Sequence, residues 1–496
     1  MGKIGLGRVA CIVTVFSAAG AISAAAQTLT TLAIFKGNDG SGPQSIIQGT
    51  DGNFYGADWR GGGTDTSSGT AFEVATSGKV TVLYAFCSPT DCSSGGNPSG
   101  LMQASNGNFY GTTYNDGTSR VQVCDSGCGA VFEITPGGEE TTLYDFCSQK
   151  DCSDGRTPEV PLLQGANGNL FGTTAAGGIY GNGLCGTSSD YCGTIFEITL
   201  NGQLTTLYRF CSLTNCADGE DPHSLVQGAD RSLYGATLLG GANGFGTFFA
   251  LSPEGTLTTL YNFNEGEGGQ IKFQGADGNF YGISGGVFRI TTSGQLTVLY
   301  SFCSQTNCSD GYGPAALLQA TDGNFYGVTY EGGSSVDNPL CERRLLGNGC
   351  GTIFKITPAG QFSTLYNFCS QANCADGSQP AALTQGTDGN LYGLTSAGPC
   401  PSGKTGCGTF FSFSLGLTPF VSANPTFGKA GYEINILGNN LTGTTRVTFG
   451  GVPATFTVVS GSLIKATVPA GANTGTVEVT TPSATLSSNV AFQILQ

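Results

Sequence analysis

Charged residues make up only 11% of this 496-residue chain, which contains a single histidine, His223, and a single tryptophan, Trp59. One histidine excludes a histidine-based metal cluster, and a Ser-His-Asp triad would have to use that one imidazole, with no nucleophile elbow in the sequence. Helical periodicity is absent beyond the N-terminus, whereas short alternating runs bounded by Gly, Asn and Asp recur throughout. With 81 Gly residues and 39% hydrophobic residues, the chain is predicted to be all-β.

The first 26 residues differ from the rest. Lys3 and Arg8 precede an apolar run at 9–19, and three alanines at 24–26 provide a small-residue cleavage site. The run is shorter than the ~20 residues that span a bilayer. We therefore predict a secretory signal peptide at 1–26, no transmembrane segment, and a soluble protein that is secreted to the extracellular space or the cell surface.

The acidic balance of the chain bears on its partners. Without Lys3 and Arg8 the 19 basic residues fall to 17, against 34 acidic ones. Such a surface repels phosphate backbones and anionic lipid, so no nucleic-acid partner is expected. Acidity also serves simply to keep an exported protein in solution.

A nine-residue stretch of the type Gln-x-x-Asp-Gly-Asn-x-Tyr-Gly organises the chain. Its seven copies begin at Gln48, Gln103, Gln164, Gln227, Gln274, Gln319 and Gln385. In the sixth unit, strands A, B, C and D are expected near 315–320, 324–329, 351–357 and 361–368, with Asp-Gly-Asn as the A–B hairpin. Four short antiparallel strands repeated in this way predict the blade of a β-propeller.

The two ends of the repeat region are complementary. A D-type strand at 29–35 has no A–C strands before it, and the last A–C set, at 381–413, has no D strand after it. We therefore predict a seven-bladed propeller over residues 27–415 whose ring is closed by the N-terminal strand. Residues 416–496 have neither cysteine nor the repeat, and their strand spacing predicts a small β-sandwich.

Two resemblances follow from these motifs. The repeat, written Gln-Gly-x-Asp-Gly-Asn-x-Tyr-Gly at 385–393 and Gly-Thr-Ile-Phe-x-Ile at 193–198, resembles the GloVer (Gloeo-Verruco) tandem repeat. That resemblance implies an exported repeat protein and brings no catalytic residues. The segment 424–479, with Asn-Pro-x-x-Gly at 424–428 and Val-Pro-Ala-Gly at 468–471, resembles an IPT/TIG immunoglobulin-like domain, which implies an extracellular spacer or interaction module.

The cysteines outside the signal peptide number 18 and fall into nine local pairs. Cys-x4-Cys pairs follow strand D, looser pairs precede strand C, and some units lack both partners of a pair rather than one. Thiolate metal sites favour Cys-x2-Cys spacing or histidine partners, so we predict disulfides and no metal or other cofactor. The pairs are Cys87/Cys92, Cys124/Cys128, Cys147/Cys152, Cys185/Cys192, Cys211/Cys216, Cys303/Cys308, Cys341/Cys350, Cys369/Cys374 and Cys400/Cys407.

Carboxylates recur at fixed places in the repeat. The Asp-Gly-Asn hairpins and the Asp-Gly pairs that follow strand D offer one carboxylate each, which favours a role in turns over calcium binding. Glu73, Glu133 and Glu197 share one position of strand C, where a solvated strand face is the alternative to acid-base catalysis. His223 is expected in a solvent-side loop. No catalytic residue is predicted.

Trp59 and Arg60 break the repeat in a Gly-rich segment between strands B and C. They are predicted ligand-binding residues, for example for a sugar, with a loop anchor as the alternative. We predict a secreted, non-catalytic protein that binds an extracellular glycan, envelope polymer or protein. The alternatives are an extracellular carbohydrate-active hydrolase or lyase on the propeller and a purely structural surface component.

Overall fold

The computed structural model describes residues 27–37, 39–62, 68–87, 93–115, 117, 127–178, 192–334, 341, 349–399 and 407–495. The predicted signal peptide, 1–26, lies outside the described residues. The expectation of an all-β protein is confirmed. The helices of the described part are four 3-10 turns: η1 (Lys150–Cys152), η2 (Thr214–Cys216), η3 (Thr306–Cys308) and η4 (Ala372–Cys374). None of them is long and apolar enough to cross a membrane.

Seven four-stranded antiparallel sheets occupy the described part of residues 28–414, and we number them in chain order. Sheet 1 consists of β2 (Ser41–Gln48), β3 (Phe54–Arg60), β4 (Thr70–Val74) and β5 (Val80–Ala85), and sheet 2 of β6 (Gly96–Gln103), β7 (Phe109–Asn115), β8 (Ala130–Ile134) and β9 (Glu140–Asp145). Sheet 3 consists of β10 (Leu163–Gln164), β11 (Leu170–Thr174), β12 (Thr194–Ile198) and β13 (Leu204–Arg209). Sheet 4 consists of β14 (Glu220–Gln227), β15 (Leu233–Leu239), β16 (Thr247–Leu251) and β17 (Leu257–Asn262). Sheets 5 to 7 are β18 (Gln270–Gln274), β19 (Phe280–Ile283), β20 (Gly286–Ile290) and β21 (Leu296–Ser301); β22 (Tyr312–Gln319), β23 (Phe325–Glu331), β24 (Thr352–Ile356) and β25 (Phe362–Asn367); and β26 (Ser378–Gln385), β27 (Leu391–Ala397) and β28 (Thr409–Ser414) with β1 (Thr28–Ile34).

Sheet 7 combines the two ends of the repeat region. Strand β1 pairs antiparallel with β28, from Thr28 opposite Ser414 to Ile34 opposite Thr409. The backbone N–H of Phe35 extends the pairing by donating to the carbonyl of Gly408 at 2.9 Å. The edge of β28 is therefore covered by a strand from almost 400 residues away in the sequence.

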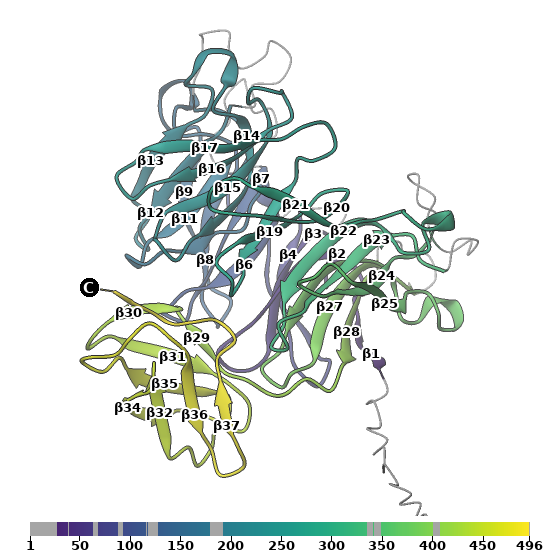
Figure 1. Ribbon diagram of the computed structural model, residues 1–496, viewed down its shortest axis with the longest axis vertical. Coiled ribbons are helices and arrows are strands. Elements are labelled where there is room, and N and C mark those ends of the chain that lie inside the picture. The colour runs from purple at the N-terminus through teal and green to yellow at the C-terminus, as the bar shows by residue number, and fades with distance from the viewer. Residues whose placement is uncertain are drawn as a thin grey trace, which may run out of the picture.

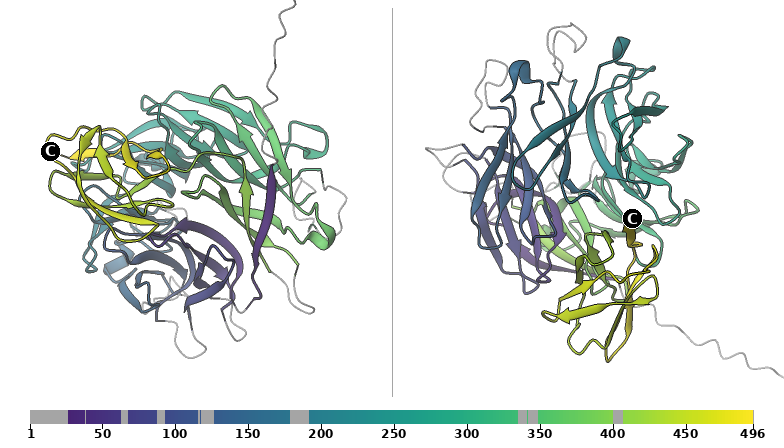
Figure 2. Two further views of the ribbon diagram at one scale, coloured as in Figure 1. Left: turned by 90° about the horizontal axis from the view of Figure 1, so that it is seen from below. Right: turned by 90° about the vertical axis from the view of Figure 1, so that its left-hand side faces the viewer.

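Buried apolar clusters join each sheet to the next. Sheets 1 and 2 share a cluster that includes Tyr55, Phe109 and Phe132, and corresponding clusters join the other neighbours. Sheets 7 and 1 share one that includes Phe54 and Phe410. Apart from sheets 2 and 3, the first strands of neighbouring sheets contact one another, so the first strands form the innermost layer of a β-propeller-like arrangement (Figure 2).

The glutamine that opens each repeat links neighbouring hairpins. Its Oε1 accepts from a backbone N–H of the preceding hairpin, as Gln103 does from Thr50 at 2.9 Å. The same bond recurs around the molecule and connects the last sheet to the first, where Thr387 donates to Gln48 at 2.9 Å. The other bonds run from Ser105 to Gln164, Ala166 to Gln227, Ala229 to Gln274, Ala276 to Gln319 and Thr321 to Gln385. This bond accounts for the glutamine in all seven copies.

The C-terminal unit consists of two four-stranded sheets around one apolar core (yellow in Figure 1). One sheet is β29 (Ser422–Asn424), β31 (Glu433–Leu437), β35 (Leu463–Thr467) and β34 (Thr455–Val458), and the other is β33 (Val452–Pro453), β32 (Arg446–Phe449), β36 (Val477–Thr480) and β37 (Thr485–Ser487). A parallel pair, β30 (Phe427–Lys429) and β38 (Gln493–Leu495), lies beside them. The unit rests on the repeat hairpins, because Asn424 donates to the carbonyl of Gln103 and Ser462 to that of Thr50.

Candidate functional site

The seven sheets present two different faces. The A–B hairpins form one face, which carries the C-terminal unit. The described parts of the B–C and D–A connections lie together on the other, which we call the loop face. There the N–H of Gly241, between strands B and C, donates to the carbonyl of Cys216 at 2.8 Å, and Gly333 donates to Cys308 in the same way. The loop face and the C-terminal unit therefore lie on opposite faces of the propeller-like arrangement of sheets.

The innermost strands of most sheets contain a β-bulge. In β14 the bulged residue is His223, between Pro222 and Ser224, and in β18 it is Lys272. In the other sheets that contain it, the bulged residue is small or uncharged, as at Ala315 and Ala381. His223 therefore lies within strand β14 and not in a loop as expected. A bulge redirects a side chain away from the regular pleat.

A cavity of about 310 Å³ opens beside these residues between sheets 3, 4 and 5. His223 of β14, Lys272 of β18 and Glu159, from the segment that precedes β10, line it together with apolar side chains such as Leu225 and Ile271. Three different ionisable groups therefore converge on one cavity at positions where the repeat varies. Such a combination of a concave site and a few polar groups is typical of ligand-binding sites.

His223 and Glu159 form the polar pair of the cavity. The Nδ1 of His223 is buried and lies 3.4 Å from Oε2 of Glu159. Burial, followed by the positive charge of Lys272, lowers the pKa of His223. Burial also raises the pKa of Glu159. A neutral imidazole at pH 7 can accept a proton or a hydrogen bond.

Two further ionisable residues, Lys272 and Asp221, interact electrostatically with this pair. The Nζ of Lys272 donates to Oε1 of Gln270 at 2.6 Å, and burial lowers the pKa of this lysine to about 8. Asp221, at the start of β14, has a buried Oδ1 without a hydrogen-bond partner. Burial and the neighbouring charges of Glu159 and Glu220 raise its pKa to about 7. Burial therefore shifts the pKa of both groups toward neutral pH, the range in which acid-base groups act.

Trp59 and Arg60 lie at the end of strand β3 in sheet 1, and not among the residues that line the cavity. The indole ring of Trp59 packs against Tyr114 with 5.3 Å between centroids, and its backbone carbonyl accepts from Nδ2 of Asn97 at 2.7 Å. Arg60 is exposed. The contacts of Trp59 are those of an anchor between sheets 1 and 2, and ligand binding by the two residues stays a prediction.

The repeated aspartates of the A–B hairpins accept hydrogen bonds from residues of the same hairpin or of the strand that follows it. Asp51 accepts from the N–H of Asn53 and, at 2.8 Å, from the hydroxyl of Tyr55. In sheet 2 the hairpin carries Asn106 instead, and Glu133 of strand C accepts the amide of Asn108 at 2.5 Å. Glu197 does the same for Asn169 in sheet 3, and Glu73 for Asn53 in sheet 1. The three strand-C glutamates therefore serve the hairpins, which explains them without catalysis.

The Asp-Gly pairs after strand D hold the D–A loops. Asp154 is buried and accepts from the hydroxyl of Tyr144 at 2.8 Å and from the N–H of Ser148 at 3.0 Å. The same tyrosine-carboxylate bond recurs at Asp218, Asp310 and Asp376. In sheet 4, where the D–A loop has no cysteine, Tyr261 donates to Glu267 instead. The donors of the loop thus satisfy these carboxylates without a calcium ion.

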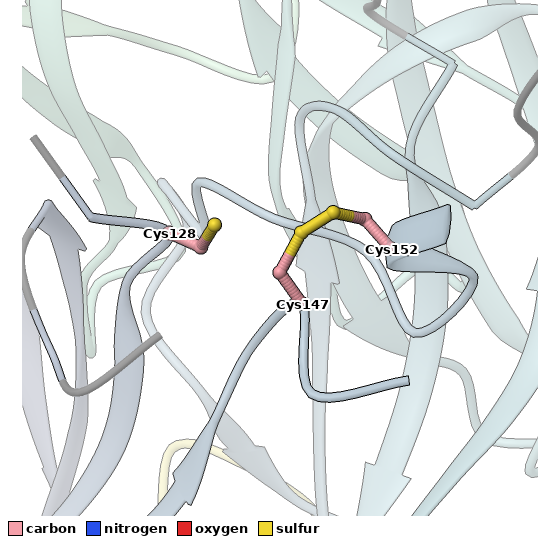
Figure 3. A group of neighbouring side chains, drawn as sticks. All are labelled: Cys128, Cys147 and Cys152. Atoms are coloured by element: carbon pink, nitrogen blue, oxygen red, sulfur yellow. A yellow bond between two sulfur atoms is a disulfide. The ribbon is translucent and has the colours of Figure 1, made fainter. Parts of the chain in front are cut away.

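Five of the predicted cysteine pairs are disulfide-bonded in the described residues: Cys147–Cys152, Cys211–Cys216, Cys303–Cys308, Cys341–Cys350 and Cys369–Cys374. Cys87, Cys128, Cys192 and Cys407 are also disulfide-bonded, while Cys92, Cys124, Cys185 and Cys400 lie outside the described residues. Figure 3 shows the sulfur of Cys128 beside the Cys147–Cys152 bond, so two disulfides pack together on the loop face. Because each of these sulfurs already belongs to a disulfide, their closeness does not indicate a metal site.

The arrangement of sheets, hairpins and loops is that of a β-propeller-like repeat protein. A family model described as "Gloeobacter/Verrucomicrobia repeat" matches residues 14–189, 185–340 and 284–479. The chain belongs to this family, as the repeat motifs predicted. No curated protein matches the chain.

The comparison with solved structures finds similarities at low sequence identity. Virginiamycin B lyase from Staphylococcus aureus is 16% identical with a TM-score of 0.50, over 78% of this chain and 99% of that one. A streptogramin B lyase is 17% identical with a TM-score of 0.49, over 78% of this chain and 97% of that one. A luciferin-regenerating enzyme is 11% identical with a TM-score of 0.38, over 79% of this chain and 97% of that one. At 16% identity the likeness to virginiamycin B lyase concerns the fold alone.

Proposed function

We propose that this protein is an exported binding protein of the bacterial cell exterior, which holds a glycan or envelope polymer in the cavity between sheets 3, 4 and 5. The carrying observation is the convergence of Glu159, His223 and Lys272, three repeat-breaking residues from three successive repeats, on that cavity. A carboxylate, a neutral imidazole and an ammonium group offer both acceptors and donors to sugar hydroxyls. The predicted signal peptide and the disulfides support export.

The proposal also covers the domain organisation of the chain. Residues 27–415 form a seven-bladed propeller closed by β1, and residues 416–496 form an immunoglobulin-like domain of the IPT/TIG type. The pairing of β1 with β28, the apolar clusters between neighbouring sheets and the glutamine bonds support closure. The shared core of the two C-terminal sheets supports the sandwich.

A second function, an extracellular carbohydrate-active lyase or hydrolase, is favoured by the His223–Glu159 pair. A neutral imidazole beside a carboxylate is able to take a proton from a substrate held in the cavity. A binding protein would bind the glycan without cleaving it, whereas a lyase or hydrolase would release cleavage products.

Screening the mature protein on a glycan array, with turnover assays on every polysaccharide that binds, separates the two functions. His223→Ala gives the cavity the residue that sheets 6 and 7 carry at the same bulge, so the fold should tolerate it. We expect His223→Ala and Lys272→Met to weaken binding about tenfold, the loss of one charged or polar contact, without lowering the melting temperature. Unchanged binding in both variants would exclude the cavity, and absence of any ligand would favour the purely structural role.

A further inference from the structure

A second cavity, of about 330 Å³, lies on the hairpin face between sheets 3 and 4 and the C-terminal unit. From the sheets it is lined by residues of the A–B hairpins of both sheets, by the C–D turn of sheet 4, and by the apolar side chains of Phe171, Leu233 and Leu251, which are buried. From the C-terminal unit, Lys429 and Leu495 close it, which are paired neighbours on β30 and β38. The cavity therefore exists only where the two units meet, a common location for ligand sites.

Arg231, at the rim of this cavity, departs from the repeat in an unusual way. Six of the seven hairpins carry glycine at its position: Gly52, Gly107, Gly168, Gly278, Gly323 and Gly389. All six have positive φ, and Arg231 adopts the same left-handed conformation, with φ 71°. A side chain other than glycine pays a steric cost there. Strain at one copy of a repeat, in a residue that reaches a cavity, is a reason to look for function.

The cavity combines three kinds of chemistry. Arg231 and Lys429 bring two cations, one from each unit, in a chain whose net charge is −15. Glu197 brings a carboxylate that already accepts the amides of Asn167 and Asn169 and has further acceptor capacity. The buried apolar side chains form the floor. Together they match a ligand with an acidic group, hydroxyl groups and an apolar ring face.

We propose that this inter-domain cavity binds an acidic saccharide, with its carboxylate held by Arg231 and Lys429, its hydroxyls donating to Glu197, and one ring face on the apolar floor. Guanidinium groups bind carboxylates with paired, charge-assisted hydrogen bonds. A simple fatty anion has no hydroxyl group that could donate to Glu197, which is why we favour a uronate. This site is separate from the cavity of sheets 3, 4 and 5 and does not depend on the function proposed for it.

The test measures binding of an oligogalacturonate to the full chain by calorimetry at low salt, with a neutral galactan oligomer of equal length as the comparison. We expect the acidic oligomer alone to bind, and binding to weaken as salt rises because exposed charges are screened. Equal binding of both oligomers, or of neither, overturns the proposal.

Arg231→Gly is the informative variant because it restores the residue of the other six hairpins. We expect it to lower affinity at least tenfold while the melting temperature stays the same or rises, which a misfolded variant would not do. Lys429→Gln should lower affinity similarly, and Arg446→Gln, an exposed cation of the C-terminal unit outside the cavity, should not. If Lys272→Met abolishes binding and Arg231→Gly does not, the oligomer binds in the other cavity and the proposal is wrong.

Discussion

Some single residues that depart from the repeat are buried ionisable groups whose pKa is strongly shifted. Asp58 is an example in sheet 1, where it is completely buried. Sheets 3, 4, 6 and 7 have threonine at this position of strand B, hydrogen-bonded to a threonine of strand C, as in Thr395 with Thr409 at 2.8 Å. Asp58 faces Thr70 in the same register, but its Oδ1 has no hydrogen-bond partner. Burial raises the pKa of Asp58 well above its ordinary value.

We predict that Asp58→Thr stabilises the protein at pH 8 by about 2 kcal/mol, because it removes an unsatisfied buried acceptor and restores the threonine pair. The effect should depend on pH. A carboxyl with a raised pKa costs nothing below its unfolded pKa of about 4, and the cost grows as pH rises toward the folded value. Thermal unfolding of both proteins at pH 4 and pH 8 measures this, with a larger gain expected at pH 8.

An equal gain at both pH values would show that Asp58 is not the titrating group. The conservative variant Asp58→Asn serves as the control, because it removes the charge and keeps the shape. It should recover the pH-dependent part of the gain and not the part that comes from the threonine pair.

The residues of the cavity between sheets 3, 4 and 5 show why a site is harder to predict than a fold. The sequence singled out Trp59 because it is unique, but its ring packs on Tyr114, and uniqueness does not reveal what a ring touches. Lys272 was missed altogether. Its bulge lies at a different place in the shortest repeat, and only the structure shows that β18 brings it beside His223.

At the scale of elements, the A–B hairpin is the unit that joins neighbouring sheets. Gln385 shows how: its Oε1 accepts the N–H of Thr321 at 3.1 Å, and its Nε2 donates to the carbonyl of Gly389 in its own hairpin at 3.4 Å. One side chain thus fixes the shape of its hairpin and the distance to the preceding one.

We predict that Gln385→Ala destabilises the protein by about 1 kcal/mol, because the N–H of Thr321 loses its acceptor in a partly buried place. Chemical denaturation measures the change. Gln361→Ala, at an exposed position before β25, is the matched control and should change stability by a few tenths of a kcal/mol at most. A loss as large in the control would mean that the inter-sheet bond is not the cause.

Strand positions were the most predictable elements, since alternation and turn residues are local signals. In sheet 6 the expected strands at 324–329 and 361–368 overlap β23 and β25 closely. The expected strand at 315–320 began too late, because β22 starts at Tyr312 and continues through a bulge at Ala315. Bulges interrupt the alternation from which strands are recognised in a sequence. The bulged part of the first strand of a sheet was therefore not predicted, and this is the part that lines the cavity between sheets 3, 4 and 5.

At the scale of the whole molecule, the two faces have different tasks. The hairpin face carries the C-terminal unit, through bonds such as that of Asn435 to the carbonyl of Ser105. The loop face holds the disulfides and the longer connections. This division followed from strand direction alone, whereas the position of the C-terminal unit had no sequence signal, because a few side-chain bonds and an apolar contact determine it.

The contact between the two ends of the repeat region determines whether the molecule folds as one unit. Leu29 and Phe35 are buried at the two ends of β1, in the clusters that join sheet 7 to sheets 6 and 1. Without β1, strand β28 would expose an unpaired edge, and both clusters would lose a member.

We therefore predict that a chain beginning at residue 37 loses its cooperative melting transition, which calorimetry and circular dichroism measure. Phe35→Ala is the milder version and should cost about 3 kcal/mol or more, as removal of a buried aromatic ring does. A peptide of residues 27–36 added to the shortened chain should restore the transition, and a peptide with the same residues in scrambled order should not. If the shortened chain melts like the full one, β1 does not close a ring. The sheets would then be stable as an open array, in which each sheet needs only its neighbours.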